Sequence, residues 1–221
     1  MEYTTTILLT EFVTHDVKRF IVSKPDGFHC QPGQGVELAI DQGEWRTQRR
    51  PFTPTSLARD KVLEFTIKTY PQHHGMTEKL HTLVAGDMLL MSAPFGAIVY
   101  RGPGVFIAGG AGITPFIAQL RQLANDNQLA GHSLIFSNKT AADVICEKEL
   151  RHYLGERAIF SCTRDNTPGY EHRRVDAAFL REKIQDFSQH FYLCGPKKFV
   201  SELKETLNGL GANPDALIFE K

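Results

Sequence analysis

The 221-residue sequence carries no net charge and has no apolar run long enough to cross a membrane. Basic and acidic residues number 25 each, and they also balance on both sides of residue 101. Neither half therefore has the basic excess of a nucleic-acid-binding surface, and no nucleic-acid or membrane partner is predicted. Residues 1–4 lack the basic start and apolar core of a signal peptide, which predicts a cytoplasmic location.

Cysteine is scarce and scattered. No Cys-x-x-Cys pair occurs, which argues against an iron–sulfur cluster, a zinc knuckle or a disulfide framework; the four cysteines are Cys30, Cys146, Cys162 and Cys194. The adjacent His73 and His74 are interpreted as a solvent-exposed loop, so no metal site is predicted.

The two halves of the chain differ in pattern. Up to residue 101, short alternating runs broken by turn residues predict an antiparallel barrel or sandwich with one helix at residues 77–84. Beyond it, strands alternate with helices, which predicts a parallel sheet covered on both faces. The predicted strands are 132–137, 158–163, 191–194 and 217–219, and the helices are 147–154, 177–184 and 198–210. We predict two domains, residues 1–101 and 102–221.

The clearest local pattern lies at the centre of the chain, in residues 105–116. An apolar β-prone run leads into glycines and an amphipathic run follows, which predicts a strand, a tight turn and a helix. Thr114 is predicted as the N-cap and Pro115 as the first helical residue. Glycines at a helix N-terminus fit a phosphate, although a connection without a ligand has the same pattern. The Gly-x-Gly-x-x-Pro spacing from Gly110 differs from the dinucleotide fingerprint Gly-x-Gly-x-x-Gly.

Three further stretches combine residue types that suit a phosphate-bearing cofactor. The run from Arg50 to Thr53 offers a guanidinium for phosphate, an aromatic ring for stacking and a hydroxyl for a ring nitrogen. The strand-like residues 67–70 precede a second helix start at residues 75–77. Cys194 lies at the carboxyl end of a strand in the predicted parallel sheet. Open α/β sheets bind ligands at this edge. Each pattern by itself also fits an ordinary core or surface residue.

The order of these motifs is more specific than any one of them. Arg-Pro-Phe-Thr, Ile-Lys-x-Tyr, Gly-Met-Thr, Gly-Gly-Ala-Gly-Ile-Thr-Pro and Tyr-Leu-Cys-Gly-Pro follow one another along nearly the whole chain. In this order the sequence resembles the ferredoxin–NADP reductase superfamily, most closely its cytochrome b5 reductase-like branch and the flavodoxin (ferredoxin) reductases. The resemblance implies an N-terminal antiparallel Greek-key β-barrel that holds FAD and a C-terminal α/β domain that binds NADP or NAD.

The resemblance also implies roles for single positions. Thr53, Cys194 and Glu220 would be the active-site residues, with Thr53 near flavin N5, Cys194 beside the nicotinamide C4 and Glu220 as an acid. Arg50 would hold the flavin pyrophosphate. The residues implied in flavin binding are Arg50, Pro51, Phe52, Thr53, Ile67, Lys68, Tyr70, Gly75, Met76 and Thr77. Those implied in nicotinamide nucleotide binding are Gly110, Gly112, Thr114, Pro115, Cys194, Gly195 and Pro196.

Two departures from the family pattern concern the flavin, and one feature concerns the nucleotide. Phe52 stands where the family usually has tyrosine, and the chain ends without the aromatic residue that covers the flavin in plant-type members. Thr163 and Arg164 resemble the Ser-Arg pair of NADP-using members, and Arg173 matches a basic residue nine places later. This pattern predicts a preference for NADPH over NADH.

The leading hypothesis is an FAD-dependent NAD(P)H oxidoreductase that passes electrons to a one-electron carrier such as ferredoxin, flavodoxin or a cytochrome. Cations that flank the flavin and nucleotide motifs favour a small acidic carrier; they are Arg46, Arg49, Lys197 and Lys198. Two alternatives stay open. One is a free-flavin or ferric reductase on the same fold, which Phe52 favours, and the other is a non-catalytic electron-transfer subunit.

Overall fold

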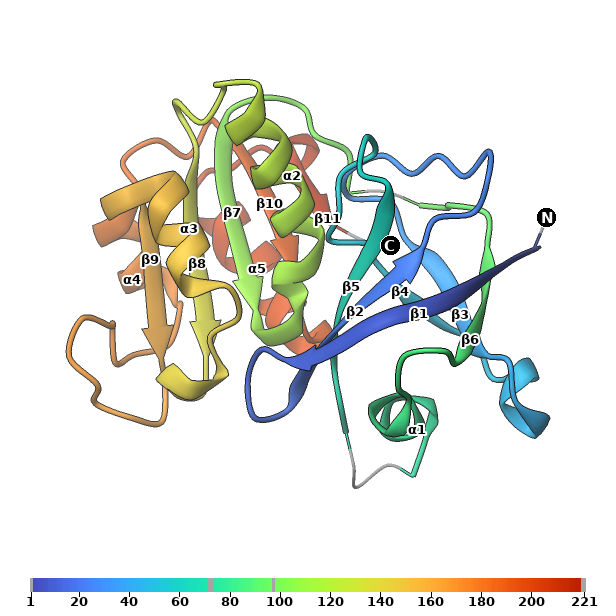
Figure 1. Cartoon of the computed structure of the whole chain (residues 1–221). Helices are drawn as coiled ribbons and strands as arrows, with labels where there is room; N and C mark the ends of the chain where they lie inside the picture. The colour runs from blue at the N-terminus through green and yellow to red at the C-terminus, as the bar shows by residue number, and fades with distance from the viewer. Residues whose placement is uncertain (1, 71–73, 97, 220–221) are drawn as a thin grey trace.

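The computed structural model describes residues 2–70, 74–96 and 98–219, which form two domains lying side by side (Figure 1). Within these residues the N-terminal domain has six strands: β1 (Glu2–Phe12), β2 (Val17–Ser23), β3 (Val36–Ile40), β4 (Arg50–Phe52), β5 (Val62–Lys68) and β6 (Met88–Ser92). They form one antiparallel sheet in the order β4-β3-β6-β1-β2-β5. Pro54, just past β4, bridges Phe65 of β5, so the two edges of the sheet meet and close a barrel.

Alternation along the strands fills this barrel. Phe20 of β2 pairs in register with Phe65 of β5, and both side chains are fully buried. Successive strand residues point to opposite faces, so the core takes every second side chain. The helix α1 (Met76–Thr82) packs Met76 and Leu80 into the same apolar cluster.

The C-terminal domain is a parallel sheet between two layers of helices. Its strands are β7 (Gly104–Gly109), β8 (Ser133–Asn138), β9 (Ala158–Cys162), β10 (His190–Cys194) and β11 (Leu217–Phe219), and its helices are α2 (Thr114–Asn125), α3 (Glu147–Leu154), α4 (Ala177–Lys183) and α5 (Lys197–Gly209). Among the described residues the strands lie in the order β11-β10-β7-β8-β9, all parallel. The chain runs from β7 outward to β9 and then crosses to β10 on the other side of β7. The carboxyl ends of β7 and β10 therefore border the switch point at which open α/β sheets bind ligands.

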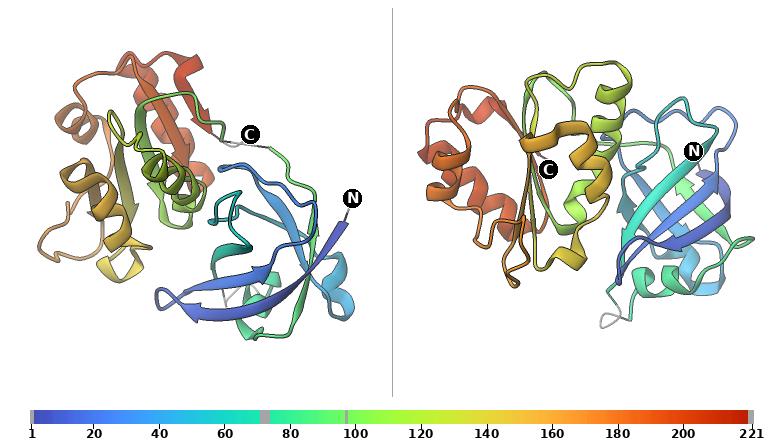
Figure 2. Two further views of the ribbon diagram at one scale, coloured as in Figure 1. Left: turned by 45° about the horizontal axis from the view of Figure 1, so that its top comes forward. Right: turned by 60° about the vertical axis from the view of Figure 1, so that its left-hand side comes forward.

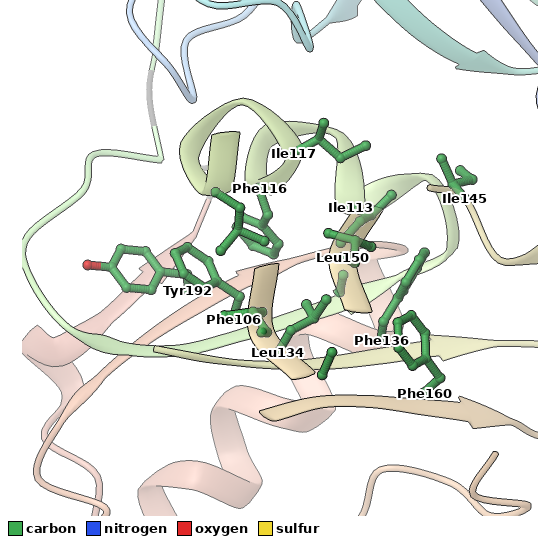
Figure 3. Packing of buried hydrophobic residues seen from close by; sticks show 14 of the residues in the cluster. Phe106, Ile113, Phe116, Ile117, Leu134, Phe136, Ile145, Leu150, Phe160 and Tyr192 are labelled. Atoms are coloured by element: carbon green, nitrogen blue, oxygen red, sulfur yellow. The ribbon is translucent and has the colours of Figure 1, made fainter. Parts of the chain in front are cut away.

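The central strand β7 is buried on both faces. Phe106 packs against Phe116 of α2, with 5.1 Å between ring centroids, in a cluster that also takes Leu150 of α3 (Figure 3). Val105 and Ile107 face the opposite layer, where α4 and α5 supply the apolar partners. This burial explains why the strand reads as a continuous apolar run rather than an alternating one.

Helix α2 lies on the side of the sheet that faces the barrel (Figure 2). Val17 of β2 and Ile98 belong to the same buried cluster as Phe116. One α2 side chain, the guanidinium of Arg121, contacts both domains. Its Nη1 donates to Glu64 Oε1 of β5 at 2.6 Å and to the Thr55 carbonyl at 2.8 Å. The junction between the domains therefore combines apolar packing with a largely buried ion pair.

On the α3 side, the Nε and Nη2 of Arg121 donate to the two carboxylate oxygens of Glu149 at 2.6 and 3.0 Å. Burial disfavours the charged form of Arg121, but the hydrogen bonds to Glu149 and the charge of Glu64 raise its pKa above the usual value. One guanidinium thus holds carboxylates of both domains.

The hydrogen-bond partners of the backbone pass from one domain to the other between residues 98 and 101. The Ile98 N–H donates to the Gly33 carbonyl in the barrel at 3.2 Å, whereas the Arg101 N–H donates to the Tyr192 hydroxyl in the α/β domain at 2.9 Å. We propose that the domains comprise residues 1–101 and 102–221.

The predicted fold class is confirmed, and the prediction for the start of α2 is wrong. The predicted helix at residues 147–154 is α3, and the helix predicted at 77–84 is α1, which begins one residue earlier. Pro115 is the second residue of α2 rather than the first, and Thr114 is not an N-cap. Thr114 already has helical dihedral angles, and its hydroxyl donates to the Ala111 carbonyl at 3.1 Å. The cause is a 3-10 turn at Gly110–Ile113, which leads into α2 without a break.

Candidate active site

Two clefts meet where the barrel joins the α/β domain. We call the first the flavin-side cleft, after the cofactor that the resemblance implies for the barrel, and its volume is about 220 Å³. It is lined by Gly35, Pro51, Phe52, Thr53, Thr66, Ile67, Lys68, Tyr70 and Thr77 of the barrel and by Ala111, Thr114, Pro115 and Cys194 of the α/β domain. The half-buried ring of Phe52 packs on the barrel core, which fixes its orientation. None of these lining residues is acidic, and they include four threonines, one lysine and two aromatic residues.

The second, the nucleotide-side cleft, has a volume of about 580 Å³. It runs along the carboxyl edge of the parallel sheet and is lined by Gly109, Gly110, Ala111, Gly112, Ser137, Asn138, Lys139, Asp143, Thr163, Cys194, Gly195, Pro196 and Phe199, with Lys68 and Tyr70 from the barrel. The two clefts share Lys68, Tyr70, Ala111 and Cys194, so they adjoin along a common wall. A ligand in either cleft would lie against Cys194.

Close backbone packing fixes the position of Cys194. Ala108 of β7 pairs in register with Cys194 of β10, and the turn after β7 folds back on the end of β10. A Cβ added at Gly112 would lie 2.5 Å from the Gly195 nitrogen, which is too close for any side chain. Gly195 itself has a φ of +155°, which a residue with a side chain rarely adopts. The glycines therefore join the two strand ends as one rigid unit.

Lys68 brings a positive charge to the wall that the clefts share. Its ammonium lies 2.7 Å from Asp16 and 3.7 Å from Asp143, so it connects the β1–β2 loop to the α/β domain. Burial favours the neutral form of Asp143, but hydrogen bonds from Thr140 and the charges of Lys68 and His15 lower its pKa below the usual value. His15, Asp16 and Asp143 also have ligand atoms within 4.8 Å of one another. Lys68 already pairs with both of these carboxylates.

The other three cysteines are buried or half-buried away from the clefts. Burial raises the pKa of Cys30 to about 11, that of Cys146 to about 12 and that of Cys162 to about 11, so these thiols stay protonated near neutral pH. No disulfide bond joins any of the four cysteines, all of which lie among the described residues. Cys194 alone among them lines the clefts.

Most of the residues predicted to bind a cofactor line one cleft or the other, but five do not. Arg50 is exposed, and its guanidinium donates to the Arg49 carbonyl at 2.8 Å. Gly75 lies outside the lining, and the buried side chain of Met76 points into the barrel core. Arg164 is exposed beside Thr163, which lines the nucleotide-side cleft.

Arg173, the fifth, is engaged elsewhere. Its guanidinium pairs with Glu171 at 3.2 Å and with Glu182 at 2.5 Å, and it lies over the ring of Phe179. Contact with a nucleotide would require it to leave both carboxylates. Glu220 lies outside the described residues. The assigned roles of all these residues stay predictions.

The cations expected to form a rim for an acidic carrier are largely paired. Arg46 contacts Asp41, Arg49 contacts Glu2, and Lys198 lies 3.7 Å from Glu202. These carboxylates cancel most of the positive charge, so the structure gives the rim little net charge.

The sequence reasoning assigned no role to Ser137, Asn138 and Lys139, which follow one another at the end of β8 and line the nucleotide-side cleft. They belong to no glycine motif. The available signal was topological, because the carboxyl ends of parallel strands meet at one edge of the sheet. The Arg164 N–H donates to the Lys139 carbonyl at 2.8 Å, so Lys139 and Arg164 are neighbours at this edge.

Comparisons with known proteins match both domains. The oxidoreductase FAD-binding domain family matches residues 5–100, and the oxidoreductase NAD-binding domain family matches residues 106–205. An NADPH oxidoreductase of Mycobacterium tuberculosis is 26% identical over 202 residues, which is 88% of this chain and 52% of the relative. NADH-cytochrome b5 reductase 1 of Aspergillus terreus is 29% identical over 222 residues, covering 90% of this chain and 74% of the relative. The chain thus spans only about half the length of the mycobacterial protein.

The fold has equally extensive matches among solved structures. A ferredoxin NADP+ reductase from Neisseria gonorrhoeae, solved with bound FAD and NADP, superposes with a TM-score of 0.86 at 21% identity. That match covers 99% of this chain and 98% of the other. The two family matches and this fold place the chain in the ferredoxin–NADP reductase superfamily, as a member with one FAD-binding and one NAD-binding oxidoreductase domain. In the part of the chain that the structure describes, no helix is long and apolar enough to span a membrane.

Proposed function

We propose that the chain takes electrons from NADPH, or from NADH, and passes them through FAD to a one-electron carrier such as ferredoxin, flavodoxin or a cytochrome. One observation carries the proposal: the two clefts share a wall at Lys68, Tyr70, Ala111 and Cys194. When bound, FAD accepts a pair of electrons from a reduced nicotinamide and releases them singly. The names of the cytochrome b5 reductase and ferredoxin reductase relatives support an electron carrier as the acceptor.

The residues of the flavin-side cleft fit FAD. Phe52 offers a ring face for a planar heterocycle, and Thr53 a hydroxyl beside it. The absence of acidic side chains among the residues that line this cleft suits a cofactor that carries a diphosphate. Cys194 and the glycines around it would align the nicotinamide. Neither these residues nor Phe52 and Thr53 need to donate or accept a proton.

The test is an absorbance spectrum of the purified protein before and after anaerobic addition of NADPH. The proposal predicts a flavin spectrum with about one FAD per chain that is bleached by the nucleotide. A protein purified without flavin that reduces added flavin would instead support the free-flavin reductase. A protein that oxidises neither nucleotide with any acceptor would support the non-catalytic alternative.

Replacing Cys194 with serine is expected to slow the reduction of bound flavin by NADPH about tenfold, a change of roughly 1.4 kcal/mol in the barrier. The residue lies on the wall between the clefts and aligns the nicotinamide without holding the flavin. Anaerobic stopped-flow absorbance measures the rate, and the ratio of flavin to protein serves as the internal control. Reduction at the wild-type rate would leave Cys194 as a packing residue.

The proposal includes a preference for NADPH. Arg164 is exposed beside Thr163, and the carboxylate of the neighbouring Asp165 accepts the Ala141 N–H at 2.7 Å. Replacing Arg164 with alanine is expected to lower kcat/KM for NADPH about tenfold and to leave that for NADH unchanged, since a charge-assisted hydrogen bond contributes roughly 1.5–3 kcal/mol.

Steady-state kinetics with both nucleotides tests the preference. Arg181→Ala, which removes an exposed guanidinium from α4, is the matched control and should leave both values unchanged. A wild-type protein that uses NADH as well as NADPH, or better, contradicts the preference but leaves the rest of the proposal intact.

A further inference from the structure

Asn138, the last residue of β8, is a buried amide at the nucleotide-side cleft. It lines that cleft, and its relative exposure is 6%. Neither its Oδ1 nor its Nδ2 has a hydrogen-bond partner among the residues that the structure describes. Its backbone carbonyl, in contrast, accepts the N–H of Thr163 at 3.0 Å and its hydroxyl at 3.3 Å. The main chain is held in place while the side-chain amide is unsatisfied.

Other buried polar side chains of the same domain form at least one hydrogen bond, and even Gln119, whose Oε1 has no partner, donates from its Nε2 to the Ile98 carbonyl. Asp143 accepts the Thr140 N–H and hydroxyl, and Ser161 donates to the Arg173 carbonyl. A buried amide that bonds to nothing destabilises the fold, whereas an apolar side chain of similar size at the same place does not. Turning the Asn138 amide toward a ligand breaks no hydrogen bond within the protein. These properties fit a group whose partner arrives with the ligand.

The order of the strands places Asn138 along the cleft. Cys194 ends β10, the glycine turn follows β7, Asn138 ends β8, and Thr163 follows β9. Asn138 pairs in register with Cys162 and therefore lies one strand beyond the glycine turn, on the side away from Cys194. A dinucleotide with its nicotinamide at Cys194 and its diphosphate at the turn would place its adenosine half over β8 and β9.

The hydrogen-bonding groups of an amide limit which part of a nucleotide can be the partner of Asn138. The Nδ2 of asparagine donates hydrogen bonds and its Oδ1 accepts them. A phosphate oxygen only accepts, whereas a sugar hydroxyl does both. We infer that Asn138 binds a ribose hydroxyl in the adenosine half of the nicotinamide nucleotide, an inference that rests on the proposed use of this cleft for that nucleotide.

The test uses the purified, FAD-loaded protein in its oxidised form, with ADP and nicotinamide mononucleotide as separate probes of the two halves. Replacing Asn138 with leucine is expected to weaken ADP binding about tenfold in calorimetric titration and to leave binding of nicotinamide mononucleotide unchanged. The ligand-free variant is expected to unfold at the same temperature as the wild type or at a higher one. A residue that only supported the fold would instead lower that temperature and weaken both probes.

The matched control is Asn208→Leu, which removes the same amide from an exposed position on α5 and should change neither binding nor unfolding. Asn138→Ala replaces the leucine variant if the larger side chain prevents folding. Undiminished ADP binding in a folded Asn138 variant overturns the inference, as does an equal loss of both probes. The proposed function fails separately, if the wild type binds neither probe and NADPH does not bleach its flavin.

Discussion

Replacing Arg121 with methionine is expected to lower the free energy of unfolding by about 3 kcal/mol, because it leaves two largely buried carboxylates without their partner. The side chains of Arg121 and Glu64 are 18% and 12% exposed, and Glu149 receives two parallel hydrogen bonds from the same guanidinium. Methionine keeps the length and apolar packing of the side chain while removing the charge. Urea unfolding followed by circular dichroism measures the change.

The control for Arg121 is Lys198→Met. Lys198 and Glu202 form an i,i+4 pair on α5 with side chains 87% and 59% exposed, and exposed pairs contribute about 0–1 kcal/mol. The flavin content of the Arg121 variant should stay near that of the wild type, since Arg121 lines neither cleft. Equal unfolding midpoints for the wild type and the Arg121 variant would show that the ion pairs across the junction contribute no stability.

The secondary structure of this chain was well predicted wherever the buried residues form a simple pattern along the sequence. The α3 helix was predicted with its observed bounds because Leu150 and Leu154 recur at helical spacing and both are buried. β7 was predicted because a strand covered on both faces is apolar throughout. Thr114 was wrongly predicted as an N-cap because the local sequence does not reveal that the preceding turn is itself helical.

The contacts between distant segments were not predictable from pattern. Arg121 and Glu64 are far apart in the chain, and a charged residue on an amphipathic helix ordinarily indicates a solvent-exposed face. The residues of the candidate site also fall into a part that local motifs predicted and a part that they did not. Cys194 and the glycine turn belong to motifs, whereas Asn138 and Lys139 gain their place in the cleft only from the order of the parallel strands.

Replacing Gly112 with alanine is expected to slow the reduction of bound flavin by NADPH about a hundredfold, since a misplacement of about 1 Å between reacting groups has an effect of this size. The added Cβ would overlap the carbonyl of Cys194 and lie 2.5 Å from the Gly195 nitrogen. Both are backbone atoms of the β10 end, so the clash is relieved only by moving that strand end away from the turn. The displacement shifts Cys194 at the wall between the clefts, while Phe52 and Thr53, which line the flavin-side cleft but not the nucleotide-side cleft, stay in place.

Anaerobic stopped-flow absorbance measures this rate, and the ratio of flavin to protein shows whether the barrel still holds its cofactor. Gly209→Ala is the matched control, because a Cβ on Gly209 at the end of α5 has no atom within 4 Å. That variant should react at the wild-type rate and be slightly more stable, since alanine favours a helix over glycine by about 1 kcal/mol. A Gly112→Ala protein that retains the wild-type rate would mean that the turn and the β10 end need not be in close contact for the two clefts to work together.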